Sequence, residues 1–271
     1  MKKLPVSVGI LSFKAPQTID ATLKQYGDFL SRVAEAKVFF QAFSETDALI
    51  AQKHRVDYLG RPDNVGIQGG MRWVAENLSQ DVILYLENDC RLTTDVDAAV
   101  AYLDNMLARI QSAEIDIMRL RSRWNPGEQF SDVAKYTKIH KPRKIHPDFQ
   151  EHHKIAKTSP VLKYLRPFKA RKLAARALYI EENPEQVCPA LRKAGDIYIG
   201  DSCALNWTNQ SIMMRRQLFL DLLDYADAHP SSRTVGGMQD MEKPLNCRWW
   251  RRQHFRIGVG DGIFTHHRLD R

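Results

Sequence analysis

The stretch Asp81-Val82-Ile83-Leu84-Tyr85-Leu86 is a short apolar run that ends in the acidic turn Glu87-Asn88-Asp89. An unbroken apolar run of this length is typical of a strand that is buried on both faces, as the strands of parallel sheets are. Ligands of open α/β sheets bind beyond the carboxyl ends of such strands. The stretch therefore predicts a buried strand that carries two carboxylates to the edge where a ligand would bind.

Strand and helix patterns alternate along most of the chain. Residues 6–12 form a β-rich first run, and Thr18 is placed to cap a helix whose apolar positions continue to Val33. The alternation predicts an α/β fold, with a Rossmann-like, mainly parallel sheet flanked by helices and joined by right-handed crossovers. Further strands are expected at 37–43, 56–59, 115–120, 196–199, 211–214 and 257–259, and further helices at 47–53, 66–77, 95–110, 169–179, 216–228 and the end of 236–250.

The chain of 271 residues carries a net charge of +8, and this charge is uneven. Residues 121–176 hold 15 Lys and Arg against four Asp and Glu, so this segment carries +11 and the other 215 residues carry −3. Clear periodicity is lost between 123 and 160, where four prolines occur. These features predict an irregular basic insertion in a slightly acidic body.

Composition excludes several classes of protein. A chain with 44% hydrophobic and 27% charged residues is an ordinary globular protein, not a collagen, a coiled coil or a disordered chain. No apolar stretch is long enough for a membrane-spanning helix, and the start lacks the apolar run of a signal peptide. The four cysteines show no Cys-x-x-Cys spacing, which argues against a zinc site and predicts free thiols in a reducing cytoplasm.

Two motifs in the first half of the chain carry groups that could do chemistry. Glu87 and Asp89 could both face one hard divalent cation, although Asn and Asp are also common in a solvated turn. The run Asn64-Val65-Gly66-Ile67-Gln68-Gly69-Gly70 could bring backbone amides close to a ligand, or it could only make a tight turn before a helix. Read alone, each motif is explained at least as well by local structure.

Two more motifs lie near the end of the chain. The segment Gly236-Gly237-Met238-Gln239-Asp240-Met241-Glu242 places two carboxylates after a loop, where one could deprotonate an acceptor hydroxyl. The same carboxylates could only favour the first turn of a helix. His266-His267-Arg268 could bind a metal and a phosphate, or could form a frayed polar terminus.

The order of these motifs resembles that of the glycosyltransferases of the A-type fold, in particular the inverting family 2. The matching positions are the β-rich start, the glycine run at Asn64 to Gly70, Glu87-Asn88-Asp89 in place of Asp-x-Asp, the acceptor-side strand and helix at 204–219, Gln239-Asp240 in place of Glu-Asp, and His266 or His267 where some members carry a histidine. The resemblance covers 5–120 and 196–268. It departs at Glu87 and Gln239, which replace an Asp and a Glu, and nothing in the family pattern matches 121–176.

The resemblance implies a metal-dependent transfer of a sugar from a nucleoside-diphosphate sugar to a hydroxyl acceptor, with inversion, in cell-surface polysaccharide or lipopolysaccharide synthesis. It implies that Mn²⁺ or Mg²⁺ is bound by Asp89 and Glu87, with help from His266 or His267. Asp240 is the first candidate for the catalytic base, and Glu242 competes with it. The donor is expected to contact Ser12, Phe13, Glu45 or Asp47, Asn64, Gly66, Gly70, Glu87 and Arg268.

On this reading, residues 1–271 form one domain, with a nucleotide-sugar-binding half at 1–120, a basic insertion at 121–185 and an acceptor-side half at 186–271. The acceptor is expected to be a saccharide or a lipid-linked molecule, and the enzyme to be cytoplasmic or peripheral on the inner membrane face. The insertion either docks to an anionic surface or packs on the core as a solvated helix. Its cations would be Lys163, Arg166, Lys169, Arg171, Lys172 and Arg176, and its apolar residues Leu162, Tyr164, Leu165, Phe168, Leu173 and Leu178.

Two other functions fit the sequence less well. A sugar-nucleotide nucleotidyltransferase usually has a glycine-rich loop after its first strand, and Ser12-Phe13-Lys14-Ala15-Pro16 contains no glycine. A non-catalytic nucleic-acid-binding protein could use the basic segment, but no helix-turn-helix, zinc-finger or RNP signature is present, so no nucleic-acid partner is expected. The aromatic residues that could stack on bases in that reading are Trp124, Tyr136, Phe149, Tyr164 and Phe168.

Overall fold

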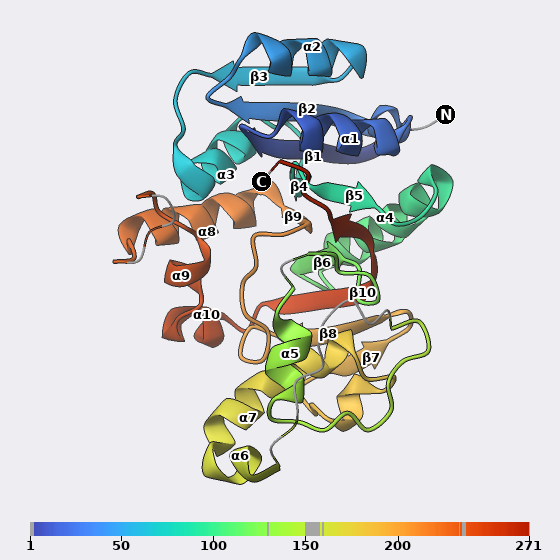
Figure 1. Ribbon diagram of the computed structural model, residues 1–271, viewed down its shortest axis with the longest axis vertical. Coiled ribbons are helices and arrows are strands. Elements are labelled where there is room, and N and C mark those ends of the chain that lie inside the picture. Colours follow the sequence, from blue (N-terminus) through green and yellow to red (C-terminus); the bar gives the residue numbers. More distant parts are fainter. Residues whose placement is uncertain are drawn as a thin grey trace.

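The computed structural model describes residues 3–128, 130–149, 158, 160–232, 234 and 237–270. One large sheet forms its centre (Figure 1). The strands are β1 (Leu4–Phe13), β2 (Val33–Gln41), β3 (Asp57–Arg61), β4 (Val82–Glu87), β5 (Cys90–Leu92), β6 (Ile117–Arg121), β7 (Arg192–Ala194), β8 (Ile197–Asp201), β9 (Ile212–Arg215) and β10 (Arg256–His266). Their order is β3-β2-β1-β4-β9-β6-β10-β8-β7, and β5 pairs with β10 outside this row.

The sheet is parallel in its N-terminal half and mixed in its other half. β3, β2, β1 and β4 run parallel to one another, as do β6 and β10. β9 is antiparallel to β4 and β6, β10 is antiparallel to β5 and β8, and β7 is antiparallel to β8. The α/β class is confirmed, and the parallel pairing expected from the sequence is found in the first four strands of the row and in the β6–β10 pair.

Helices cover both faces of the sheet. Those of the body are α1 (Pro16–Tyr26), α2 (Glu45–Lys53), α3 (Gly66–Glu76), α4 (Val96–Gln111), α8 (Arg216–Ala228), α9 (Glu242–Leu245) and α10 (Arg248–Gln253), with a 3-10 helix η1 (Phe29–Arg32). One core lies against α1, α2 and α4, and the other lies against α3 and α8. Val82 and Leu84 of β4 belong to the first core and Ile83 and Tyr85 to the second, which explains the unbroken apolar sequence of this strand.

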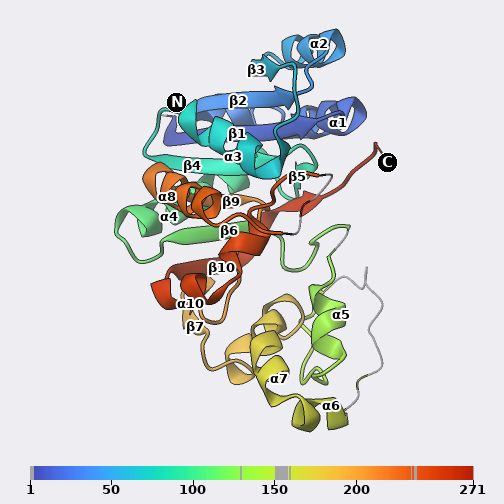
Figure 2. The same cartoon turned by 90° about the vertical axis from the view of Figure 1, so that its left-hand side faces the viewer.

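The described part of the basic insertion forms a helical lobe at one end of the molecule (Figures 1 and 2). Its elements are α5 (Asp132–Thr137), α6 (Pro160–Leu165), α7 (Pro167–Ala174), η2 (Ala175–Tyr179) and η3 (Pro184–Gln186). Val133, Tyr136 and Leu178 from this lobe are buried in the same core as α3 and α8. The lobe is therefore packed into the fold, and the basic helix expected at 169–179 is present as α7 followed by η2.

Two expectations about element boundaries are wrong. The first helix does not run to Val33: it ends at Tyr26, because Gly27 adopts a φ of +54°, and Val33 begins β2. Thr18 is not the helix cap, since Pro16 begins the helix and the Thr18 side chain accepts hydrogen bonds from the backbone of Leu269 and Asp270, at 2.9 and 3.2 Å.

The second half of the chain also differs from expectation in its strands. The strand expected at 257–259 is the longer β10, and the short strands β5 and β7 were not expected. The C-terminal tail is not frayed, because Asp270 Oδ2 accepts a hydrogen bond from the Thr18 backbone N–H at 2.8 Å. No helix among the described residues is long and apolar enough to cross a membrane.

Candidate active site

The acidic turn lies where the order of the strands reverses. The chain runs outward from β1 to β2 and β3, then returns to place β4 on the other side of β1. Glu87 is the last residue of β4 and pairs in register with Leu11 of β1, and Asn88 Nδ2 donates to Ser12 Oγ at 3.3 Å. This is the position where open α/β sheets bind their ligands.

The C-terminal strand brings a buried histidine to the same place. β10 pairs antiparallel with β5, with His266 opposite Cys90, and His266 is 5% exposed. The His266 Nδ1 atom lies 3.3 Å from Asp89 Oδ1, and the backbone N–H of His267 donates to the carbonyl oxygen of Asp89 at 2.9 Å. The structure thus brings His266 to the predicted metal-binding turn, whereas the side chain of His267 is exposed.

The residues at this position fit a divalent cation. Asp89 Oδ1 is buried, and its one close polar neighbour among the described residues is His266 Nδ1 at 3.3 Å, so this carboxylate oxygen can still accept a cation. Burial lowers the pKa of His266, which favours the neutral imidazole that can act as a ligand. Oxygen and imidazole donors suit Mn²⁺ and related divalent ions.

Cys90 lies beside these donors but is poorly suited to bind the ion. Its Sγ is 3.4 Å from His266 Nε2 and accepts from Ser211 Oγ at 3.3 Å. Burial, together with the nearby charges of Asp89 and Glu87, raises the pKa of the thiol well above its usual value. The thiolate is the form that ligates metals, so Cys90, whose Sγ lies in one group with Asp89 and His266, would have to lose its proton to become a third ligand.

The two carboxylates of the turn have opposite pKa shifts. Burial raises the pKa of Glu87 to about 8, and the charges of Asp89 and Glu242 act in the same direction. Burial also acts to raise the pKa of Asp89, but the contact with His266 and the positive charges of Arg268 and Arg121 outweigh it and hold that pKa below its usual value. Asp89 is therefore the ionised member of the pair at neutral pH, and a bound cation would favour ionisation of Glu87 as well.

A polar cavity of about 340 Å³ is lined by Arg121 and Glu242, whose charges both act on Glu87 of the turn, although no residue of the turn itself lines it. Glu242 lines it, and burial followed by the charges of Asp240 and Asp132 raises the pKa of this carboxyl. Asp240 is not among the lining residues: its Oδ1 accepts from Asn209 Nδ2 at 2.9 Å and from the Glu242 backbone N–H at 3.1 Å. Of the two predicted base candidates, the structure therefore places Glu242 at the cavity and gives Asp240 a positioning contact.

The glycine run has a clear local role at the start of α3. Asn64 Oδ1 accepts from the Gly66 backbone N–H at 2.9 Å, and Gly66 has a φ of +75° that favours glycine. At Gly70 a side chain would have no room, since a Cβ would lie 2.7 Å from Leu11 Cδ2. The run packs α3 closely against the sheet, and no contact in it points to a ligand.

The predicted nucleobase contacts separate into two roles. Asp47 is buried and caps α2, where its Oδ2 accepts from the Ser44 backbone N–H at 2.9 Å and from the Ser44 hydroxyl at 2.8 Å. Glu45 is exposed in the first turn of the same helix. Phe13 at the end of β1 is half-buried, and the Lys14 ammonium lies 5.6 Å from its ring centroid.

Sequence analysis did not find the arginines of β6. Arg119 and Arg121 lie on the same face of this strand and both line the cavity. Arg121 is only 5% exposed, donates to the carbonyl oxygens of Pro126 and Glu128 at 2.6 and 2.9 Å, and has no carboxylate within 4 Å among the described residues. The alternation of arginines in an expected strand could have revealed this cationic face.

Arg268 is exposed at the end of the chain and lies close enough for its charge to lower the pKa of both Glu87 and Asp89. Its guanidinium donates to the carbonyl oxygen of Asp270 at 3.1 Å. The structure therefore brings together Ser12, Glu87, Asp89, His266, Arg268 and Glu242, while Glu45, Asp47, Asn64 and Gly70 make up the surrounding frame.

Comparison with known proteins yields matches in structure only. No protein-family model and no curated protein sequence matches the chain. Glucosyl-3-phosphoglycerate synthase from Mycobacterium tuberculosis, in complex with Mn²⁺ and UDP-glucose, is 13% identical, with 98% of this chain and 72% of that chain covered and a TM-score of 0.50. A mycobacterial protein is 14% identical, with coverages of 98% and 68% and a TM-score of 0.50.

A third structure, residues 1–349 of Staphylococcus aureus TarS, is 11% identical and has a TM-score of 0.48. The match covers 98% of this chain, which spans only 60% of that chain. Identities this low establish the fold and leave the activity open. The chain has the A-type glycosyltransferase fold, as the order of its sequence motifs led us to expect.

Proposed function

We propose that this chain is a metal-dependent glycosyltransferase that moves a sugar from a nucleoside-diphosphate sugar to a hydroxyl acceptor. One observation carries the proposal: the turn between β4 and β5 and the last residue of β10 bring Asp89 and His266 within 3.3 Å of each other, near a cavity that Glu242 lines. The similar synthase from M. tuberculosis binds Mn²⁺ and UDP-glucose, which supports this class of donor and cofactor.

Asp89 and His266 would hold the divalent cation, Mn²⁺ or Mg²⁺, with Glu87 as the neighbouring carboxylate. When bound, the cation would offset the negative charge that develops on the diphosphate leaving group. The Arg268 guanidinium is near the same carboxylates and has donors that suit phosphate oxygens. The exposed His267 ring would lie at the edge of this phosphate site.

Glu242 would act as the general base. The acceptor hydroxyl must lose a proton as it attacks the sugar, and a base works best when its pKa lies near the working pH. Burial of Glu242 raises its pKa in that direction. Asp240 would act as a positioning residue, because its Oδ1 accepts from the Glu242 backbone N–H.

The cavity would hold the acceptor, and its charge favours an acceptor that carries negative charge. Arg176 Nε lies 2.8 Å from Asp132 Oδ1, so these two lining residues neutralise each other. Arg119 and Arg121 have no such ion pair among the described residues. A saccharide or lipid-linked acceptor with a phosphate or carboxylate group would supply the missing charge.

The remaining parts of the proposal rest on the family resemblance. They are inversion at the anomeric carbon, a role in cell-surface polysaccharide or lipopolysaccharide synthesis, and a cytoplasmic or peripheral inner-membrane location. The donor nucleotide would lie along Ser12 and Phe13, with the exposed Glu45 as the acidic residue available to the nucleobase.

A donor screen tests the proposal. The protein is mixed with a panel of nucleotide sugars and nucleoside diphosphates, with and without Mn²⁺ or Mg²⁺, and its melting temperature and release of sugar are measured. A ligand at 100 times its dissociation constant stabilises a protein by about 2.7 kcal/mol, so a nucleoside diphosphate should raise the melting temperature only when the metal is present.

The variant Asp89→Ala should lose the metal-dependent shift and the sugar release while it remains folded. The exposed Asp57→Ala is the matched control and should keep both. Two results would refute the proposal. In the first, a nucleoside diphosphate stabilises the wild-type protein equally with and without metal. In the second, the protein releases pyrophosphate from a nucleoside triphosphate and a sugar phosphate.

A further inference from the structure

The α6–α7 segment carries an unusual group of exposed apolar side chains. Val161, Tyr164, Leu165 and Phe168 are 59%, 81%, 70% and 90% exposed, and we call these four residues the apolar tip. Val161, Tyr164 and Leu165 share one face of α6 by their spacing, and Phe168 lies in the first turn of α7, after the break in the helix at Arg166. The three most exposed large apolar side chains among the described residues all belong to this tip.

The tip is held in place by a second apolar face on the same segment. Ala170 and Leu173 of α7 are buried and pack with Ile139, and Leu162 is half-buried against this cluster. His140 Nε2 lies 2.9 Å from the carbonyl oxygen of Ala170, which joins the loop after α5 to α7. The segment therefore uses one face to pack on the protein and leaves the other face uncovered.

Exposed cations surround the apolar tip and form no ion pair with any described acidic residue. They are Lys163, Arg166, Lys169, Arg171 and Lys172. The sequence contains no Asp or Glu from 152 to 180, and none of these five forms an ion pair with a carboxylate in the described part of the chain. Desolvation and the charges of Arg251, Arg176 and Lys243 lower the pKa of Lys172, which shows how closely positive charge is gathered here.

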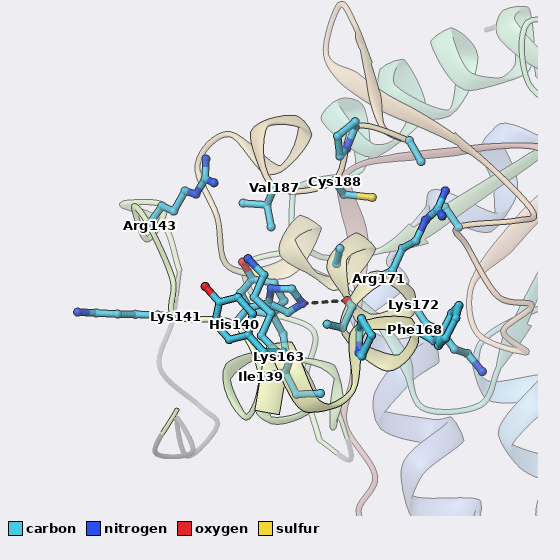
Figure 3. Close-up of a pocket in the computed structure, with 18 of the residues that line it drawn as sticks. Ile139, His140, Lys141, Arg143, Lys163, Phe168, Arg171, Lys172, Val187 and Cys188 are labelled. Atoms are coloured by element: carbon cyan, nitrogen blue, oxygen red, sulfur yellow. Dashed lines mark hydrogen bonds between the residues drawn. The ribbon is translucent and has the colours of Figure 1, made fainter. Parts of the chain in front are cut away.

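A cavity of about 940 Å³ opens beside the tip (Figure 3). Tyr164 and Phe168 of the tip line it, together with the apolar side chains of Ile139 and Val187. Its charged lining residues are all cations, namely Lys141, Arg143, Lys163, Arg171, Lys172 and Arg251. The tip and the cavity thus form one continuous surface that is apolar at its centre and positive around it.

We propose that the apolar tip docks the protein onto a lipid bilayer with anionic headgroups. Aromatic and aliphatic side chains flanked by Lys and Arg are the chemistry of interfacial membrane binding: the apolar residues enter the boundary region, and the cations meet anionic lipid. The tip lies at the opposite end of the molecule from α2 (Figures 1 and 2).

The side chains of this surface also differ from those of a nucleic-acid-binding site. Of the five aromatic residues considered for base stacking, Trp124 and Tyr136 are buried, and Trp124 stacks on His146 at 3.8 Å between ring centroids. Only Tyr164 and Phe168 are exposed, and they share their face with aliphatic Val161 and Leu165. Aliphatic side chains offer nothing to the face of a base but insert readily among acyl chains.

Vesicle co-sedimentation of the full chain tests the proposal. Vesicles of phosphatidylcholine alone are compared with vesicles that contain about 30% phosphatidylglycerol. We expect binding to the anionic vesicles that weakens with added salt, because electrostatic attraction is screened. The double variant Leu165→Ala/Phe168→Ala should bind at least about tenfold more weakly, since it removes two large apolar side chains.

Two controls match these changes. Leu49→Ala removes an apolar side chain that is 59% exposed on α2, and it should bind as the wild type does. Lys163→Gln/Lys169→Gln should also weaken binding by about tenfold or more, whereas Lys3→Gln/Lys24→Gln, which changes two exposed cations elsewhere, should not. Donor hydrolysis without vesicles should be the same in all of these variants, so a failure of the proposed enzyme activity would be seen separately.

Several results would overturn the proposal. They are no binding to anionic vesicles, equal binding to neutral and anionic vesicles, and unchanged binding of Leu165→Ala/Phe168→Ala. Sedimentation velocity provides one more: if Phe168→Ala converts a dimer to a monomer, the tip is covered by a second copy of the chain. The surface would instead bind nucleic acid if two results were found together. The protein would bind a random oligonucleotide tightly and in a salt-sensitive way, with this binding lost in Phe168→Ala, and it would not bind vesicles.

Discussion

Replacing Glu242 by Gln should remove most of the transfer activity and leave the fold intact. A positioned general base contributes about 10²–10⁴ in rate, which corresponds to about 3–5 kcal/mol at 1.36 kcal/mol for each factor of ten. The loss should appear in kcat, because the amide keeps the size of the side chain and the cavity keeps its shape. The ascending limb of the pH–rate profile should lie above the ordinary glutamate range, since burial raises the pKa of Glu242.

The same pKa shift sets the expected effect on stability. A carboxyl whose pKa is raised on folding favours the folded state while it is protonated, and this contribution is lost as the pH rises from the unfolded pKa through the folded pKa. At neutral pH the buried charge of Glu242 therefore opposes folding. Glu242→Gln should have an unchanged or higher melting temperature at pH 7.

Asp240 provides the matched comparison. Asp240→Asn retains the Oδ1 acceptor for Asn209 Nδ2 and for the Glu242 backbone N–H, so activity and stability should change little. Asp240→Ala removes both hydrogen bonds and should cost about 1–3 kcal/mol, or about 2–4 °C in melting temperature for each kcal/mol. In Asp240→Ala the melting temperature should therefore fall, while the rate of sugar transfer stays closer to that of the wild type.

Initial rates of sugar release from the best donor, measured between about pH 5 and pH 9, together with thermal unfolding, separate these cases. The reasoning is refuted if Asp240→Asn loses a factor of about 100 or more while Glu242→Gln stays near wild type, because Asp240 would then be the base. It is equally refuted if both amide variants stay near wild type, because no carboxylate of this cavity would then take the proton.

Three further changes test the frame around the site. The Glu35 carboxylate accepts a hydrogen bond from the Ser79 backbone N–H at 2.7 Å. Burial acts to raise the pKa of Glu35, but hydrogen bonds from Lys37, Ser7 and Ser79 outweigh it and lower the pKa to about 2. After allowance for solvent screening, Glu35→Gln should lower the free energy of unfolding by about 2 kcal/mol at pH 7, as measured by urea unfolding. Because this pKa is lowered, the difference should disappear as the pH falls from about 5 to 2. Gly70→Ala would place a Cβ 2.7 Å from Leu11 Cδ2 and should lower the unfolding free energy by about 1–3 kcal/mol, which thermal unfolding would show. Arg121→Gln removes the guanidinium that donates to the carbonyl oxygens of the buried Pro126 and the exposed Glu128, and it should destabilise by about 1–3 kcal/mol, with weaker binding of any anionic acceptor in titration calorimetry.

The hydrophobic pattern of the sequence predicted those helices and strands whose formation depends on residues close together in the chain. The apolar run before Glu87 is β4, and α8 begins and ends where its periodicity indicates, at Arg216 and Ala228. β10 was predicted too short because its sequence contains three glycines among residues 258–262, which do not look like a strand. Gly262 has a φ of +73°, and a Cβ there would lie 2.3 Å from the carbonyl oxygen of Arg121, so glycine lets the strand continue past this close contact.

In the candidate site, too, the sequence predicted some features and missed others. The resemblance in motif order grouped Asp89 with His266 or His267, and the structure places the His266 ring beside Asp89 and leaves the His267 side chain exposed. The choice between Asp240 and Glu242 could not be made from the sequence, because it depends on which carboxylate faces a cavity formed by distant segments. Arg121 was counted only as charge in the basic insertion, since nothing local shows that it is buried.

The basic insertion contributes to the proposed active site as well as to the surface, although its sequence gives no sign of this. Its first loop is bound to β10 next to His266, where the Glu128 backbone N–H donates to the carbonyl oxygen of His266 at 3.0 Å. Further along, α5 separates the two cavities: Asp132 and Lys135 line the one with Glu242, and Tyr136 lines the one beside the apolar tip. If the tip rests on a membrane, α5 connects it to the proposed acceptor cavity, and the full burial of Tyr136 anchors this helix in the core. Such an arrangement suits an acceptor that is itself attached to lipid, and it accounts for a segment with a charge of +11 in a body whose remaining residues carry −3.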